Sequence, residues 1–154
     1  MPRARVLMDE LDRKIITILQ ADGRASNARI AREVRVSEGT VRRRLKRLVE
    51  EGFIRVAALP QPEKLGYETE AIVGVQADPD KLDEVGDRLS QLKEVQWAAV
   101  TTGAYDVMLW VTVPSADELG TLLRTKIGAV PGVRRTETFV ALSVKKRAGA
   151  LPVM

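Results

Sequence analysis

The segment from Ser26 to Gly52 constrains the fold more than any other part of this chain. Its apolar residues recur at helical spacing, break at Arg35-Val36-Ser37 and resume at once, which predicts two short helices joined by a tight turn. The second helix carries five basic residues in six consecutive positions: Arg42, Arg43, Arg44, Lys46 and Arg47. A short basic helix after a tight turn is typical of an element that enters the major groove of DNA.

The charge distribution supports this interpretation. The whole chain carries +4, but residues 1–66 hold 15 basic and 9 acidic residues, a net charge of +6. Residues 67–154 hold 10 basic and 12 acidic residues, a net charge of −2. A cationic first part beside a slightly acidic second part indicates that only the first part binds a polyanion.

The residue types that are missing exclude several kinds of site. The chain contains no cysteine and no histidine. Disulfides, thiol nucleophiles and cysteine zinc sites are therefore excluded, and the commonest general base is absent. We predict no catalytic residue, no metal site and no cofactor. The first residues lack the apolar core of a signal peptide, and no apolar run reaches membrane-spanning length. We therefore expect a cytoplasmic protein without a membrane partner.

The first part of the chain predicts a three-helix domain over residues 1–59. Asp9 is placed to cap a helix that ends at Asp22-Gly23, while Ser26 and Ser37 are placed to cap the next two. The segment Phe53–Leu59 has the pattern of a trailing strand. Pro60 and Pro62 then interrupt the chain, so residues 60–66 are the predicted hinge linker.

The second part predicts a different architecture over residues 67–147, followed by a tail at 148–154. Apolar strands at Ala71–Ala77 and Val107–Val113 are each followed by an amphipathic helix and another strand. Two such halves give a βαββαβ sheet with both helices on one face, which is the ferredoxin-like plan. The predicted fold class is α+β, with an N-terminal helix-turn-helix domain and a C-terminal ferredoxin-like domain.

Helical geometry orients the basic residues of the third helix. With Val41, Leu45 and Leu48 facing the core, Arg43, Lys46 and Arg47 point outward. The predicted DNA-binding residues are Ser26, Asn27, Arg29, Ser37, Gly39, Thr40, Arg42, Arg43, Arg44, Lys46 and Arg47. Arginine can grip a guanine edge, whereas lysine more often contacts phosphate.

Two alternatives remain open for the basic helix. Its outer face could be a solvated surface on which Lys46 pairs with Glu50 and Arg47 with Glu51. Arg44 lies nearer the core edge and could form an internal ion pair instead of contacting phosphate.

The motifs of this chain resemble those of the Lrp/AsnC family, the leucine-responsive or feast/famine regulators. In the first part the matching residues are Leu11-Asp12, Ile15, Leu19, Gly23-Arg24, Ile30-Ala31, Ser37, Val41, Arg44, Leu48, Gly52 and Ile54. In the second part they are Thr102–Asp106 and Pro131-Gly132-Val133. Two departures stand out: Arg35 replaces the usual glycine of the inter-helix turn, and Arg29 replaces a frequent glutamate.

The resemblance implies an assembly and a ligand. It implies a homodimer built through the sheets of the second domain, with dimers associating further, for example into an octamer. It also implies an amino-acid effector bound near a turn of that domain, by Thr102, Gly103, Tyr105 and Asp106. Thr136 and Thr138 on the last strand are predicted to line the same pocket. The alternative for Thr102–Asp106 is an ordinary hairpin turn.

We therefore predict a sequence-specific transcriptional regulator that binds double-stranded DNA. The first alternative is an architectural protein that compacts DNA with little sequence preference. A remote alternative is a tetrapyrrole decarboxylase, because some of those enzymes share the two-domain plan. The absence of histidine and the basic third helix argue against an enzyme.

Overall fold

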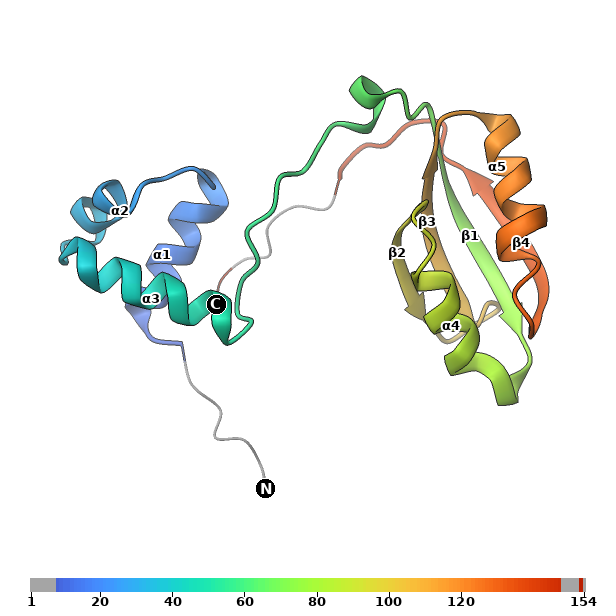
Figure 1. Cartoon of the computed structure of the whole chain (residues 1–154), viewed down its shortest axis with the longest axis horizontal. Coiled ribbons are helices and arrows are strands. Elements are labelled where there is room, and N and C mark those ends of the chain that lie inside the picture. Colours follow the sequence, from blue (N-terminus) through green and yellow to red (C-terminus); the bar gives the residue numbers. More distant parts are fainter. Residues whose placement is uncertain (1–7, 148–152, 154) are drawn as a thin grey trace. The chain divides into compact units, whose positions relative to one another are not determined.

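The computed structural model describes residues 8–147 and residue 153, and the chain divides into two compact units. The first unit comprises Met1–Ala58 with Arg147–Met154, and the second comprises Leu59–Lys146 (Figure 1). Most of the predicted tail at 148–154 lies outside the described residues. Val153 is described, and it packs against the apolar core of the first unit.

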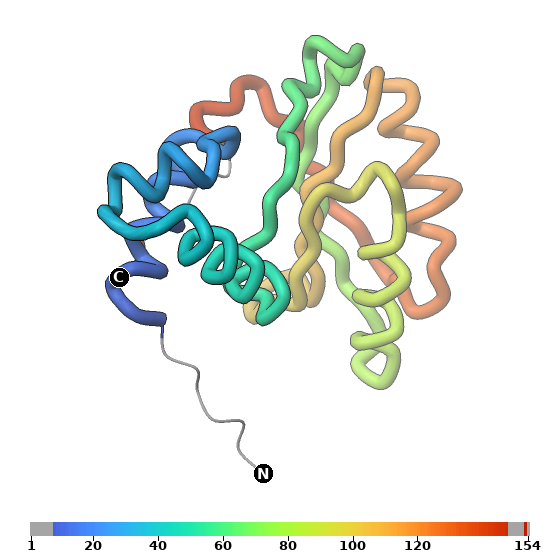
Figure 2. Tube along the Cα trace, turned by 60° about the vertical axis from the view of Figure 1, so that its left-hand side comes forward, coloured from blue at the N-terminus to red at the C-terminus, as the bar shows by residue number. Residues whose placement is uncertain are grey.

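The first unit is built from three helices, α1 (Glu10–Ala21), α2 (Asn27–Val34) and α3 (Glu38–Glu50), which Figure 2 follows from blue to cyan. Each begins after the predicted cap, since the side chains of Asp9, Ser26 and Ser37 accept the backbone N–H three residues further on. A cap of this kind stabilises a helix by about 1 kcal/mol because it satisfies an otherwise unpaired N–H group.

The three helices bury a small apolar core. Its fully or almost fully buried members are Ile15, Ile16, Ile30, Ala31, Val41 and Leu48. All three helices contribute, so the core fixes the angle between α2 and α3. The helix-turn-helix unit predicted from the sequence is confirmed by this arrangement.

The predicted strand at Phe53–Leu59 is not formed, and this prediction was wrong. The backbone N–H groups of Phe53 and Ile54 both bond to the carbonyl of Leu48, and the chain then runs without regular structure. Val56 and Leu59 are 62% and 78% exposed. A strand requires a neighbour for its backbone hydrogen bonds, and no described segment of the protomer pairs with this one. The hinge that follows contains a short 3₁₀ turn, Pro62–Leu65.

The second unit has the predicted βαββαβ order. Its elements are β1 (Thr69–Ala77), α4 (Leu82–Ser90), β2 (Val95–Val100), β3 (Val107–Val113), α5 (Ala116–Leu122) and β4 (Val133–Val140). A π-helical turn, Leu123–Ile127, extends α5. The four strands form one antiparallel sheet in the order β2-β3-β1-β4, and both helices cover the same face (Figure 1).

Strand alternation gives the sheet two different faces. Alternate residues of β1 and β3 enter the helix-covered core, which includes Val73, Val75, Leu109 and Val111. The residues between them point to the other face, which no helix of the second unit covers within the described residues. We call this the open face; it carries Ile72, Trp97, Met108, Trp110 and Phe139. Trp97 and Phe139 are 56% and 45% exposed, so the open face presents large apolar side chains to solvent.

Candidate nucleic-acid interface and effector turn

Two of the five cations of α3 are held inside the first unit. Arg44 Nη1 lies 2.6 Å from Asp9 Oδ2 and 3.3 Å from Asp12 Oδ1. Arg47 Nη2 donates a short hydrogen bond to Asp12 Oδ2. The sequence-based orientation of Arg47 as an outward residue was therefore wrong, while the internal ion pair considered for Arg44 is formed. A long arginine side chain can place its charged group far from the direction of its Cβ atom, which is why the helical pattern did not reveal this contact.

Asp12 is the residue on which this arrangement depends, and its side chain is completely buried. It is also the third residue of α1, where its carboxylate accepts the backbone N–H of Asp9 in a capping box. The reciprocal bond from the Asp12 N–H, with help from Arg44, holds the pKa of the Asp9 carboxyl below its ordinary value. We call Asp9, Asp12, Arg44 and Arg47 the charge cluster; it joins the start of α1 to α3.

The other cations of α3 remain accessible. Arg43 is exposed and has no ion-pair or hydrogen-bond partner among the residues that the structure describes. Arg42 pairs with Glu38 at 3.2 Å and Lys46 with Glu50 at 3.7 Å, both one turn apart on the exposed helix surface. Such pairs contribute about 0.2–0.5 kcal/mol, so a DNA phosphate can readily replace the glutamate.

The surface of α3 is open at Gly39. A Cβ atom added there would meet no heavy atom within 4 Å. Ser37 and Thr40 hydrogen-bond to each other through their hydroxyl groups at 2.8 Å, and Ser37 also caps α3. Their predicted role at DNA is thus combined with a role in the fold.

The predicted residues of α2 are similarly engaged. Ser26 caps the helix, and Asn27 is its first residue. The Arg29 guanidinium lies 2.9 Å from Glu33 and 2.5 Å from Asp22, and these two hydrogen bonds raise its pKa. Arg29 is thus paired within the protomer by two exposed ion pairs, and its predicted contact with phosphate stays a prediction.

Three exposed cations near this surface were not among the predicted DNA-binding residues. Arg24, Arg32 and Arg35 have no ion-pair partner within residues 8–147. The sequence contains a signal for these three arginines, namely the excess positive charge of residues 1–66. The predicted set assigned most of that charge to α3. The structure adds them to the accessible cations around the helix-turn-helix.

The turn between β2 and β3, where effector contacts were predicted, is fastened by its own hydrogen bonds. Gly103 adopts a φ of 106°, which only glycine adopts readily. Asp106 Oδ2 accepts the backbone N–H of Ala77 at 2.9 Å, and Thr101 Oγ1 donates to the carbonyl of Tyr105 at 2.9 Å. One oxygen of Asp106 is thus used to attach the turn to β1, and Thr102 and Gly103 remain exposed.

Tyr105 extends from this turn onto the open face. Its ring lies directly over Gly74, where an added Cβ atom would come within 2.6 Å of the ring. Its hydroxyl group donates a short hydrogen bond to the Glu137 carboxylate, and its ring meets Phe139 edge-on, with centroids 6.4 Å apart. Through these contacts of Tyr105, the turn between β2 and β3 is linked to residues on the open face of the sheet.

Thr136 and Thr138 do not join Tyr105 within the protomer. The register pairs Thr136 with Val75 and Thr138 with Val73, so both threonines point to the helix-covered face. Tyr105 contacts Glu137, the residue between them, on the opposite face. The expected common pocket is not formed in one protomer, because side chains of a strand alternate between the faces.

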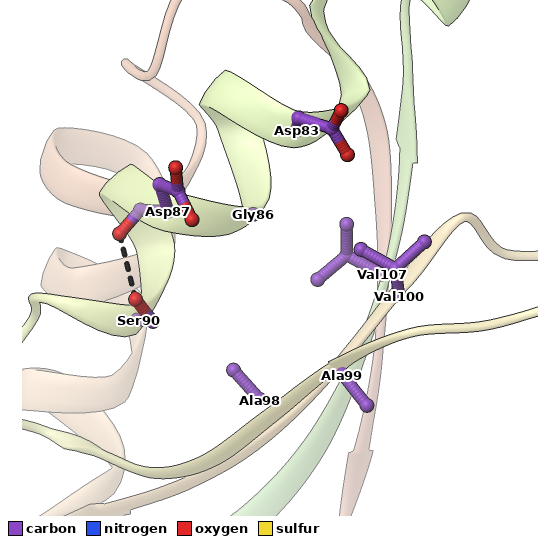
Figure 3. Close-up of a pocket in the computed structure, with 8 residues that line it drawn as sticks. All are labelled: Asp83, Gly86, Asp87, Ser90, Ala98, Ala99, Val100 and Val107. Atoms are coloured by element: carbon purple, nitrogen blue, oxygen red, sulfur yellow. Dashed lines mark hydrogen bonds between the residues drawn. The ribbon is translucent and has the colours of Figure 1, made fainter. Parts of the chain in front are cut away.

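A separate groove lies between α4 and β2 (Figure 3). Its volume is about 200 Å³, and Asp83 and Asp87 stand on its α4 side. The residues that line it are Asp83, Gly86, Asp87, Ser90, Ala98, Ala99, Val100 and Val107. None of these residues belongs to the predicted effector set.

No group of three or more acidic side chains in the described part of the chain could hold a metal ion. No helix within the same residues is long and apolar enough to cross a membrane.

The geometry defines a class: a helix-turn-helix DNA-binding unit joined to a ferredoxin-like unit. Comparison with known families agrees, because residues 8–55 match the winged helix-turn-helix DNA-binding family. Residues 70–151 match the Lrp/AsnC ligand binding domain family. The chain therefore belongs to the Lrp/AsnC family, and the resemblance inferred from its motifs is confirmed.

Relatives extend over almost the whole chain. An uncharacterised HTH-type transcriptional regulator of Pyrococcus furiosus is 45% identical over 141 residues, covering 91% of this chain and 95% of the relative. The HTH-type transcriptional regulator FL11 of Pyrococcus abyssi is 37% identical over 150 residues, covering 97% and 99%. These relatives identify the chain as a DNA-binding transcriptional regulator.

Solved structures agree with the fold. The AsnC structure from E. coli has a TM-score of 0.85 and 29% identity, covering 94% of this chain and 98% of that one. A transcriptional regulator from Neisseria meningitidis, in complex with L-Met, has a TM-score of 0.86 and 25% identity, covering 95% and 97%. The predicted α+β fold of the two units is confirmed.

Proposed function

We propose that this regulator reads double-stranded DNA through the outer face of α3, with Arg43 as its principal base contact. The observation that carries this proposal is the difference between the cations of α3. Arg44 and Arg47 are held by the charge cluster, Arg42 and Lys46 form only weak exposed pairs, and Arg43 is unpaired among the described residues. An unpaired arginine on a helix that faces the major groove can donate a bidentate hydrogen bond to O6 and N7 of guanine, and this contact gives base specificity.

The roles of the flanking cations follow from their exposure. Arg42 and Lys46 exchange their glutamate partners for phosphates when DNA binds, which fixes the position of α3 without reading sequence. Each phosphate contact adds about 0.9 to the slope of log K against log salt. Arg43 therefore determines specificity, while Arg42 and Lys46 contribute affinity that falls with salt.

The experiment compares Arg43→Ala with Lys46→Ala on a duplex selected from genomic fragments. We expect Arg43→Ala to weaken specific binding by about 1–3 kcal/mol for each bidentate base contact that is lost, which reduces its advantage over non-specific binding. Lys46→Ala is expected to weaken specific and non-specific binding alike. The matched control is Arg88→Gln in the second unit. Arg88 is exposed and pairs with Glu84 one helical turn away, and its replacement should leave DNA binding unchanged.

Two results would contradict the proposal. Retained specificity in Arg43→Ala would remove Arg43 from base recognition. A flat distribution of selected fragments would favour the alternative of an architectural protein that compacts DNA.

The open face of the second unit is proposed as the homodimer interface. It presents Trp97 and Phe139 to solvent, and a large exposed apolar patch of this kind is typical of a protein interface. A symmetric pairing through this face would bring two copies of α3 to successive half-sites of DNA. We also propose that these dimers associate further, up to an octamer.

We further propose that a small amino acid modulates this assembly by binding near Thr102, Gly103, Tyr105 and Asp106. The match of residues 70–151 to a ligand binding domain family supports a ligand, and a neighbouring structure contains L-Met. Since Tyr105 reaches Glu137 on the open face, a ligand at this turn can affect the dimer interface. We propose no catalytic function for this chain.

A further inference from the structure

The turn between α2 and α3 contains an arginine in a backbone conformation that does not suit it. Arg35 has a φ of 58° and a ψ of 48°, which is the left-handed helical region. It is the one residue other than glycine with a positive φ in the part of the chain that the structure describes. This conformation brings the Cβ atom of an L-residue too close to the following carbonyl, so glycine or asparagine would fit with less strain.

The contacts of Arg35 within the protomer do not explain why arginine stands there. Its side chain is exposed, and its guanidinium has no hydrogen bond or ion pair with any residue of 8–147 or 153. By contrast, Arg29, Arg42, Arg44 and Arg47 all have carboxylate partners. The strain at Arg35 is thus not offset by an observed internal interaction.

The backbone nevertheless holds Arg35 in a fixed place. Its N–H group bonds to the carbonyl of Ala31, and the N–H group of Val36 bonds to the same carbonyl at 3.1 Å. Arg35 stands two residues before Ser37, the cap of α3. It therefore lies at the amino-terminal end of the helix that we propose to enter the groove, the end at which such helices approach DNA.

We propose that Arg35 contacts a DNA phosphate and that the strained backbone is retained for this contact. Residues in sparsely populated backbone regions persist where the surroundings fix them, and they are concentrated at functional sites. A guanidinium on a residue whose backbone is fixed beside the start of α3 would bind one phosphate and fix how deeply the helix enters the groove. This inference rests on the proposed DNA-binding role of α3, and it adds a residue that lies outside that helix.

A structural role for Arg35 would have a different signature. A cation at the carboxyl-terminal end of α2 interacts favourably with the helix dipole. If that were its purpose, removing the charge would destabilise the first unit. If Arg35 contacts a DNA phosphate instead, replacing it by glycine relieves the backbone strain and removes the contact. The first unit then becomes more stable, while DNA binding weakens.

The test uses the full chain with Arg35→Gly and Arg35→Asn, which both tolerate the left-handed conformation and lack the charge. We expect the melting temperature of the first unit to rise by roughly 4 °C in Arg35→Gly. We also expect the slope of log K against log salt to fall in both variants, by about 0.9 for each protomer that contacts the DNA. Each lost contact corresponds to about fivefold weaker binding at 0.15 M salt, for specific and non-specific duplexes alike.

Two controls accompany these variants. Arg35→Lys keeps both the charge and the strain, so it should keep the salt slope of the wild type. Arg88→Gln removes one positive charge from the second unit, so it should change neither the slope nor the melting of the first unit. The first unit can be followed separately, because both tryptophans and both tyrosines lie in Leu59–Lys146. Circular dichroism at 222 nm reports helices of both units, and aromatic fluorescence reports only the second.

An unchanged salt slope in both Arg35→Gly and Arg35→Asn would overturn the inference. A lower melting temperature in Arg35→Gly would assign Arg35 to the end of α2 instead. If the Arg35 variants leave the slope unchanged while Arg43→Ala loses specificity, the inference alone fails. If Arg43→Ala also keeps its specificity, the proposed function fails with it.

Discussion

The buried carboxylate of Asp12 provides the strongest prediction about the first unit. Asp12→Asn keeps the size of the side chain but removes the charge that Arg44 and Arg47 share. Breaking a buried ion pair by removing one partner costs about 3–5 kcal/mol. Here we expect about 3 kcal/mol, the lower end of that range, because the side chains of Arg44 and Arg47 are each 31% exposed and can turn toward water.

This loss is large for a unit of this size. Small domains are stable by about 5 kcal/mol at the low end, so most of the stability of the first unit would be removed. A loss of 3 kcal/mol lowers a melting temperature by roughly 12–24 °C. The core of the second unit contains no residue of the charge cluster, so its stability should not change.

The assay compares two signals during thermal unfolding of the full chain. In Asp12→Asn, the circular dichroism at 222 nm should acquire an early transition, while the aromatic fluorescence of the second unit keeps its wild-type midpoint. The matched control is Arg42→Gln, which removes only the exposed pair with Glu38 and should change stability by less than about 0.5 kcal/mol. A first unit that melts as in the wild type would refute the argument, because the charge cluster would then not hold α1 to α3.

Three further predictions concern acid stability, assembly and ligand binding. The pKa of Asp9 is held below its ordinary value of 3.8, so its contribution to stability is present above about pH 4 and is lost as the pH falls through the folded-state value. Asp9→Asn should therefore flatten the acid-unfolding profile of the first unit below pH 4, measured by circular dichroism at 222 nm. Trp97→Lys should reduce the assembly to smaller species in sedimentation velocity, and an unchanged sedimentation coefficient would reject the open face as the interface. A cognate amino acid at 100 times its Kd should stabilise the second unit by about 2.7 kcal/mol, seen as a higher fluorescence midpoint. Gly103→Val should abolish this shift.

The parts of the structure that were predicted well depend on local rules. Asp9, Ser26 and Ser37 cap their helices because a short polar side chain beside an apolar helical pattern needs no distant partner. The strand at Val107–Val113 was predicted at its observed bounds, since a near-continuous apolar run is typical of a strand in a sheet core.

The predictions that failed depended on distant partners. Phe53–Leu59 has the composition of a strand, but composition does not supply the neighbouring strand that would bond to it. The position of the Arg47 guanidinium depends on Asp12, 35 residues away, whose burial is a tertiary effect. Thr136 and Thr138 were correctly recognised as sharing one face of a strand. Which face Tyr105 would occupy depends on how the turn folds back over Gly74.

Two of the five cations of α3 are paired with carboxylates inside the first unit, so their number alone overstates the outward positive charge of the helix. Arg44 and Arg47 are neutralised by Asp9 and Asp12, so they contribute to the position of the helix more than to its outward charge. The remaining three lie on the exposed side, where Arg43 alone lacks a partner among the described residues. A helix held by buried ion pairs can present one arginine in a defined direction, and a defined direction is what recognition of a base edge requires. If Arg43 reads a base as proposed, its direction depends on Asp9 and Asp12, two carboxylates at the start of α1 that need not touch DNA themselves.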